Sequence, residues 1–233
     1  MNISPSERAA AVVAAVTTPV VIVAVAVLLF LNPIWVGLDQ DRSDVTGLTG
    51  YTATQVRQVT GSILSDLVFG PPNFDVTVDG TPNGAPVLDL SERGHMADVR
   101  KVLMGFGLVA LVGAVLLAVV ALYGRGRRWF WRAAATGARV LVVGVVVVGL
   151  AFAVFFDQAF ELFHEIFFAP GTYMFDVRTE KLVQLFPDQF WSETSVAIAA
   201  AVLVLAVLVA VVAARLGREP ARAVAAPAAA WAP

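Results

Sequence analysis

Four long apolar stretches alternate with polar segments along this chain of 233 residues. The apolar stretches cover about residues 9–31, 99–123, 138–156 and 194–215. A helix needs about 20 predominantly apolar residues to cross the hydrocarbon core of a bilayer, and the stretches have about that length. The pattern therefore predicts an all-α membrane protein built on a bundle of four transmembrane helices.

The long polar segment at residues 32–98 has patterns of its own. Within residues 51–69, apolar positions recur every three or four residues and stop before Gly70, which predicts an amphipathic helix. Apolar and polar residues alternate over residues 74–79, which predicts a short strand with residues 87–90 as its candidate partner. We therefore expect a small α+β lobe attached to the bundle.

The end of this segment is expected to start the second spanning helix early. Ser91 is a candidate N-cap for a helix that begins outside the apolar stretch and continues into it. His95 and Asp98 then lie three residues apart on one face of its first turns.

Another amphipathic helix is predicted at the start of the polar segment 157–193. One helical stripe consists of Phe156, Phe160, Phe163 and Phe167. A polar stripe consists of Asp157, Glu161, His164 and Glu165. Such a pattern is typical of a helix that lies in the membrane interface.

Composition supports the membrane class and removes several kinds of chemistry. The chain is 58% hydrophobic and only 15% charged, which lies outside the usual range of soluble proteins. It contains no cysteine, so disulfides, thiolate metal sites and cysteine nucleophiles are excluded. The first apolar stretch is longer than the core of a signal peptide and is not followed by a cleavage site, so we expect it to be a retained helix.

The distribution of arginine predicts the orientation. The connection between the second and third stretches contains Arg125, Arg127, Arg128, Arg132 and Arg139 and no acidic residue. By the positive-inside rule it is cytoplasmic, and the arginines near both termini then fall on the same side. We therefore expect both termini inside, with segments 32–98 and 157–193 outside. Residues 1–218 form one predicted membrane domain, and the Ala- and Pro-rich residues 219–233 are predicted to be a disordered cytoplasmic tail.

The chain has two histidines, His95 and His164, and this topology puts both on the outer side. They precede the second stretch and follow the third, so a shared site is geometrically reasonable. An imidazole exchanges protons near neutral pH, and a carboxylate one turn away, at Asp98, Glu161 or Glu165, could orient it. Imidazole and carboxylate groups could also hold zinc or manganese, although we expect no metal and no cofactor.

The residues around the two histidines resemble a known family. Glu92, His95, Met96, Asp98, Val99 and Arg100 match its E-x-x-H-M-x-D-V-[KR] motif. Phe163-His164, Phe167-Phe168, Phe175-Asp176 and residues 185–191 match its F-H-x-x-F-F…F-D…L-F-P-x-x-F-[FW] signature. The chain is similar, over most of residues 1–215, to the four-pass bacterial membrane proteins that include the lipoprotein intramolecular transacylase Lit.

This resemblance implies acyl transfer from the sn-2 position of a lipoprotein's diacylglyceryl group to the α-amine of its N-terminal cysteine. It implies that His95 and His164 are catalytic and that the partners are lipoproteins or other lipids of the bacterial cell membrane. We expect His95, oriented by Asp98, to be the general base and His164 to be the proton donor, with the reverse assignment open. Glu92, Asp176 and Arg178 are weaker candidates for substrate contacts. Tyr173 is a further candidate, and it stands where the family has tryptophan.

Two other functions fit the same sequence features. A four-helix envelope protein without enzymatic activity, such as a sensor or an accessory subunit, could use the histidines to respond to pH. A metal-dependent lipid esterase could use the histidines and carboxylates as ligands. Close placement of both imidazoles on one cavity would favour the acyltransferase.

Overall fold

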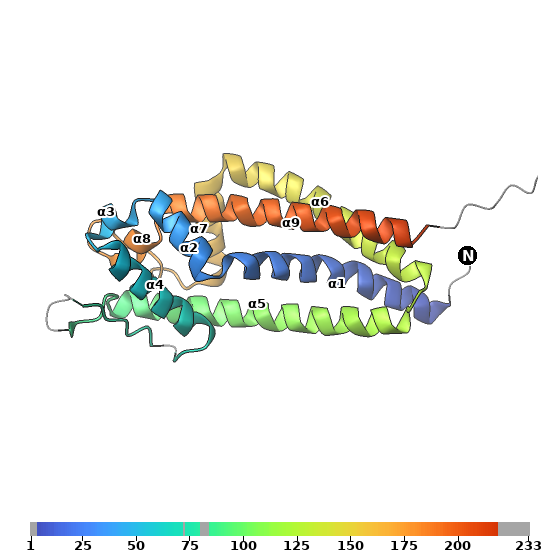
Figure 1. The fold of residues 1–233 in the computed structure, drawn as a ribbon, viewed down its shortest axis with the longest axis horizontal. Coiled ribbons are helices and arrows are strands. Elements are labelled where there is room, and N and C mark those ends of the chain that lie inside the picture. Colours follow the sequence, from blue (N-terminus) through green and yellow to red (C-terminus); the bar gives the residue numbers. More distant parts are fainter. Residues whose placement is uncertain (1–3, 72, 80–83, 219–233) are drawn as a thin grey trace, which may run out of the picture.

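The computed structural model describes residues 4–71, 73–79 and 84–218. The tail predicted at 219–233 lies outside the described residues. The long helices lie side by side, and shorter helices are gathered into a lobe at one end (Figure 1). The first long helix begins, and the last one ends, at the opposite end of the bundle.

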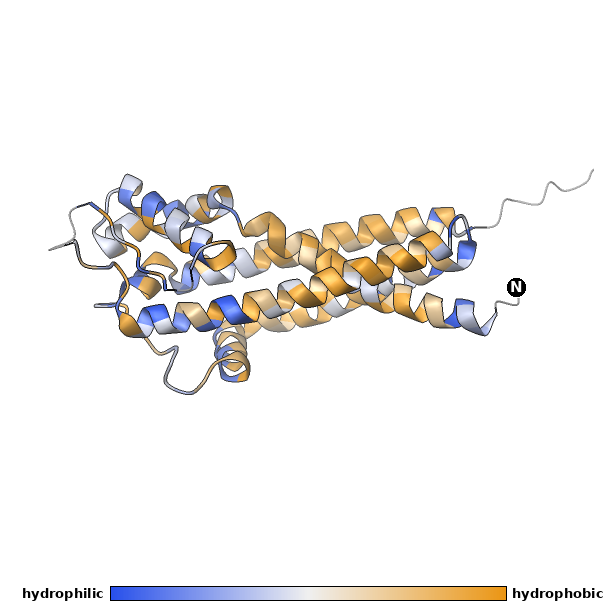
Figure 2. Cartoon of the chain, turned by 90° about the horizontal axis from the view of Figure 1, so that it is seen from below, coloured by the Kyte–Doolittle hydropathy of each residue, from blue (hydrophilic) through white to orange (hydrophobic). Residues whose placement is uncertain are grey.

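The long helices confirm the prediction of four spans. They are α1 (Pro5–Phe30), α5 (Leu90–Tyr123), α6 (Arg128–Val154) and α9 (Asp188–Leu216). Each is long and apolar enough to cross a membrane. α1 packs against the other three, and α6 also packs against α9. Figure 2 shows the apolar surface along the bundle and polar residues at both of its ends.

Helices α1 and α6 approach closely at a proline and a glycine. Pro19 has no N–H group, so the carbonyl of Ala15 one turn earlier lacks its usual helical partner. A side chain at Gly137 would place its Cβ only 2.2 Å from that carbonyl oxygen. Gly137 therefore lets the backbone of α6 lie directly against α1.

The lobe is formed by α2 (Pro33–Arg42), α3 (Val45–Thr49), α4 (Ala53–Val68), α8 (Lys181–Leu185) and the first turns of α5. The amphipathic helix predicted at 51–69 is confirmed as α4, which buries Val59 and Ile63 completely. Phe74, Leu88 and Leu185 are also fully buried in this core. The lobe is therefore a packed unit that can hold side chains in fixed positions beside the bundle.

The strand predicted at 74–79 is wrong, because the described residues contain no strand. The alternation reflects burial: Phe74, Val76 and Val78 all point into the lobe core. One backbone hydrogen bond, from the Val87 N–H to the Val76 carbonyl at 2.7 Å, joins this segment to its predicted partner. An irregular segment can thus bury alternate residues against helices without forming a β-ladder.

Helix α5 begins before the apolar stretch, as predicted, but its N-cap is Asp89 and not Ser91. The Asp89 side chain accepts from the backbone N–H of Glu92, and Glu92 accepts from the N–H of Asp89. This reciprocal pair is a capping box, in which an acidic residue three positions on completes the cap.

The helix predicted from the phenylalanine stripe is confirmed as α7 (Phe156–Phe167). It follows α6 after a break at Phe155 and runs across the direction of the bundle in Figure 1. Its side chains Leu162, Ile166 and Phe167 are exposed. Such a face suits a helix lying along a membrane surface.

Candidate functional site

The two histidines face each other where the lobe meets the bundle. His95 lies in the second turn of α5, before the apolar part of that helix, and His164 lies in the last turn of α7. Their ring centroids are 6.0 Å apart and their planes differ by 22°. The structure therefore brings together the two residues on which the sequence analysis placed the chemistry.

His95 is buried among aromatic rings. Its ring centroid lies 4.7 Å from that of Phe168 and 5.5 Å from that of Phe175. Its Nδ1 atom is buried and has no hydrogen-bond partner among the described residues. Burial, together with the nearby His164, lowers the pKa of His95 from 6.5 to about 4. At neutral pH this imidazole is therefore uncharged.

His164 is half-buried and is oriented by its own helix. Its Nδ1 atom lies 2.7 Å from the carbonyl oxygen of Phe160, one turn earlier. Because a carbonyl can only accept, Nδ1 must carry the hydrogen. In the neutral ring, Nε2 then has a free lone pair and can accept a proton.

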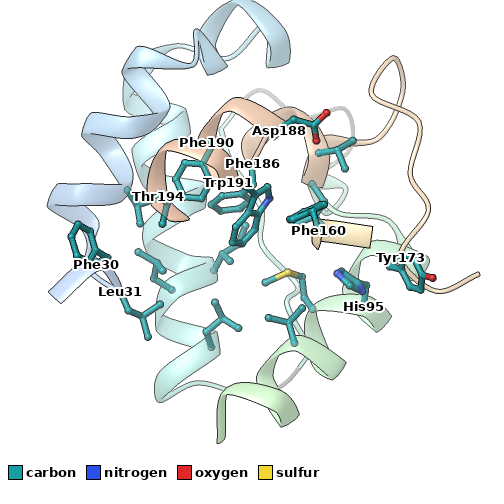
Figure 3. A pocket seen from close by; sticks show the side chains of 18 of the residues that line it. Phe30, Leu31, His95, Phe160, Tyr173, Phe186, Asp188, Phe190, Trp191 and Thr194 are labelled. Carbon is teal, nitrogen blue, oxygen red and sulfur yellow. The ribbon is translucent and has the colours of Figure 1, made fainter. Parts of the chain in front are cut away.

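Both imidazoles line an apolar cavity of about 280 Å³. Residues from α1, α4, α5, α7 and α9 contribute to its wall, together with the segment around Tyr173 and Phe175. In Figure 3, His95 and Tyr173 lie on one side of the cavity, and Phe30 and Leu31 lie on the opposite side. The cavity thus combines two imidazoles with a mostly apolar space that suits an acyl chain.

The carboxylates expected to orient the histidines do not do so. Asp98 lies on the same helix as His95 but accepts from Lys101, at 2.8 Å, because an acid and a base three residues apart meet on a helix surface. Glu161 and Glu165 are exposed on α7, and His164 is instead held by a backbone carbonyl. The orienting groups are therefore backbone and aromatic rings.

Glu92 is buried and joins two elements of the lobe. One carboxylate oxygen accepts from the Leu182 N–H at the start of α8, and the other accepts from the Asp89 N–H, both at 2.6 Å. Burial raises the pKa of this carboxyl, while the two backbone hydrogen bonds oppose the rise. Glu92 is only 2% exposed and both of its oxygens accept from protein backbone, so in this structure it links two elements of the lobe.

Of the other three residues predicted to contact the substrate, one lines the cavity and two lie outside it. Tyr173 lines the cavity, with its ring centroid 5.1 Å from that of His164. Asp176 and Arg178 lie on an exposed turn and pair with each other, with Arg178 Nη2 2.6 Å from Asp176 Oδ2. This pair stabilises the turn that follows Phe175 and does not line the cavity.

Sequence reasoning missed a hydrogen-bonded network of polar side chains beside the cavity, of which Thr194 lines the wall. The indole N–H of Trp35 donates to the Thr194 hydroxyl at 3.0 Å, and that hydroxyl donates to Asp39 Oδ2 at 2.6 Å. Burial raises the pKa of Asp39 above its usual value. None of these three residues belongs to a recognisable motif, and only their positions beside the first and last apolar stretches could have drawn attention to them. These hydrogen bonds fix α2 against α9 beside the cavity.

The described residues contain no group of three or more histidine, aspartate, glutamate or cysteine side chains that could hold a metal ion.

The fold and this cavity define an integral membrane protein with a histidine pair between a helical bundle and a polar lobe. A family model described as "Lipoprotein intramolecular transacylase Lit" matches residues 12–191. The chain therefore belongs to this family of acyltransferases.

Solved structures agree with the fold. The structure of the membrane integral lipoprotein intramolecular transacylase Lit from Bacillus cereus matches with a TM-score of 0.76 and 18% identity, over 91% of this chain and 95% of that chain. Two structures of the same protein, each with one histidine substituted, match with TM-scores of 0.71 at the same identity. They cover 91% of this chain and 92% and 93% of theirs. The search of curated proteins gave no match.

Proposed function

We propose that this protein is a lipoprotein intramolecular transacylase of the bacterial cell membrane. Family membership supports this class of reaction. The observation that carries the proposal is the pair of imidazoles, 6.0 Å apart, in the wall of an apolar cavity. Within one substrate, an acyl chain moves from a glyceryl oxygen to the amine of the N-terminal cysteine.

The reaction needs proton transfer more than it needs an enzyme nucleophile. A bond forms between the amine nitrogen and the ester carbonyl carbon, and the bond from that carbon to the glyceryl oxygen breaks. One proton moves from the nitrogen to the departing oxygen. Holding both groups of the substrate in one confined cavity supplies much of the rate acceleration.

The surroundings of the two imidazoles favour different roles for them. His164 has its Nδ1–H bonded to the Phe160 carbonyl, so its Nε2 accepts the proton of the attacking amine and returns it to the leaving oxygen. His95 stays neutral because burial lowers its pKa, and its N–H group donates to the oxyanion that forms on the carbonyl. These roles reverse the assignment that the sequence favoured.

The site is proposed to face the outer leaflet. The arginine-rich connection between α5 and α6 lies at the end of the bundle far from the cavity. By the positive-inside rule this end is cytoplasmic, so both termini lie inside and the lobe lies outside. Helix α7 then rests in the outer interface, where a diacylglyceryl group would arrive.

The test compares histidine variants with a matched surface variant in lipid vesicles containing a diacylglyceryl lipopeptide. His95→Gln and His164→Gln should each lower the transfer rate about a hundredfold or more, because each removes a proton-transfer or oxyanion contact. Arg57→Gln, at an exposed position of α4, should leave the rate unchanged. Histidine variants that keep their melting temperature and their full activity would overturn the proposal.

A further inference from the structure

A second apolar cavity, of about 590 Å³, lies in the bundle next to the histidine site. Its wall comes from α6 and α9, with Val23 from α1 and Phe156 from α7. It has Ile198 in common with the histidine cavity. Phe156 also stacks on Phe160 of the histidine cavity, with ring centroids 5.6 Å apart and planes 23° apart. The two cavities are therefore neighbours divided by a thin wall of side chains.

The depth of this second cavity corresponds to one leaflet of a membrane. Along α9 its lining runs from Ser192 to Val202, which is about 15 Å at 1.5 Å per residue. The hydrocarbon core of a bilayer is about 30 Å thick, so one leaflet of acyl chains spans about half of that. The cavity thus starts at the level of the lobe and reaches the middle of the bundle.

The residues that line the second cavity are apolar, except for two serines at the end near the lobe. Ser192 and Ser195 are the polar lining residues, and both belong to the outer turns of α9. Gly144 and Gly149 line the α6 side, and a Cβ added to either would meet nothing within 4 Å. The space next to these glycines is therefore open for a flexible chain.

We propose that this second cavity binds the acyl chain that the substrate retains during transfer. The inference rests on the proposed function, in which a diacylglyceryl group presents two chains joined through one glyceryl unit. The chain to be transferred must lie beside the imidazoles, in the first cavity. The retained chain then needs an adjoining apolar space of leaflet depth, and the second cavity provides it on the far side of Ile198 and Phe160.

The test fills the cavity without touching the histidines. Gly144→Leu and Gly149→Leu place an isobutyl group in the open space, and Gly107→Leu on α5 is the control because it is exposed and meets nothing within 4 Å. Two lipopeptides with the same transferred chain are compared, one with a palmitoyl and one with an acetyl group as the retained chain. Filling should lower the palmitoyl-to-acetyl ratio of kcat/KM about tenfold or more, and the control should leave the ratio unchanged.

Unchanged ratios in both filled variants, which are expected if the cavity holds an ordinary membrane lipid, would overturn the inference. Equal losses on both lipopeptides would overturn it too, because they report altered helix packing. A diazirine on the retained chain gives a second measurement that does not depend on turnover. Light should attach it to residues 141–156 and 192–202, and attachment elsewhere would contradict the inference. Attachment at these sites without any transfer by the unaltered protein would contradict only the proposed function.

Discussion

His95 and His164 are the same chemical group in two different surroundings. His95 is enclosed by Phe168 and Phe175 with its Nδ1 unpartnered among the described residues, so its charged form is disfavoured. His164 is less enclosed and gives its Nδ1–H to a backbone carbonyl. In the proposed mechanism, the buried neutral imidazole of His95 stabilises the oxyanion and the half-buried imidazole of His164 moves the proton.

The lowered pKa of His95 predicts a loss of stability in acid. Between pH 6.5, the ordinary value, and about pH 4, the unfolded chain binds a proton at His95 that the folded protein does not. The contribution of this residue is therefore present above pH 6.5 and is lost as the pH falls toward 4. Melting temperatures of the unaltered protein should fall over this window by more than those of His95→Gln. Equal falls in both proteins would show that His95 is not buried in its neutral form.

The sequence allowed the two histidines to be placed together, but it did not reveal their partners. Their positions beside consecutive spans made a shared site geometrically reasonable. The choice of hydrogen-bond partner depended on local competition: Asp98 pairs with Lys101, and His164 with the carbonyl of Phe160. Such competition is decided by side-chain rotamers and burial, which spacing alone does not determine.

At the scale of elements, Glu92 fixes the start of α5 to the start of α8. Its two oxygens accept from backbone N–H groups on different elements. His95 follows one turn later on α5, and the segment before α8 contains Tyr173 and Phe175, whose rings pack on the histidines. The Glu92 carboxylate thus fixes the start of α5, which contains His95, relative to the segment that contains Tyr173 and Phe175.

Replacement of Glu92 by glutamine should weaken this link. A glutamine side chain has one acceptor oxygen, so one buried N–H group would lose its partner at a cost of about 1–3 kcal/mol. The melting temperature should fall by several degrees, and transfer activity should fall with it. Asp41→Asn, at an exposed position of α2, provides the control. A Glu92→Gln protein as stable and as active as this control would refute the linking role.

The type of each element was predicted well where the hydrophobic pattern repeated over many residues, and poorly where it covered only a few. Four apolar stretches and the amphipathic stripes of α4 and α7 each repeat over several turns, and all became helices. The six residues 74–79 alternate just as a strand does, yet they form an irregular segment packed against helices. A strand needs a partner to hydrogen-bond, and no pattern within one segment specifies that partner.

The whole molecule has two polar ends: the lobe forms one end, and most of the arginines lie at the other. Because the chain has no cysteine, single cysteines can report which end faces outward. Arg57→Cys on α4 should react with a membrane-impermeant maleimide in intact cells, and Arg125→Cys between α5 and α6 should react only after the membrane is opened. Labelling in the opposite order would place the cavity at the cytoplasmic leaflet.

The central claim is that the histidine cavity moves an acyl chain within a single substrate. The measurement that tests it most directly is tandem mass spectrometry of a diacylglyceryl lipopeptide incubated with the purified protein in lipid vesicles. Intramolecular transfer leaves the total mass unchanged, so fragmentation should place one acyl chain on the N-terminal amine and leave the glyceryl group with one chain. A product with both chains still on the glyceryl group, or one that has gained water and released a free fatty acid, would contradict the account.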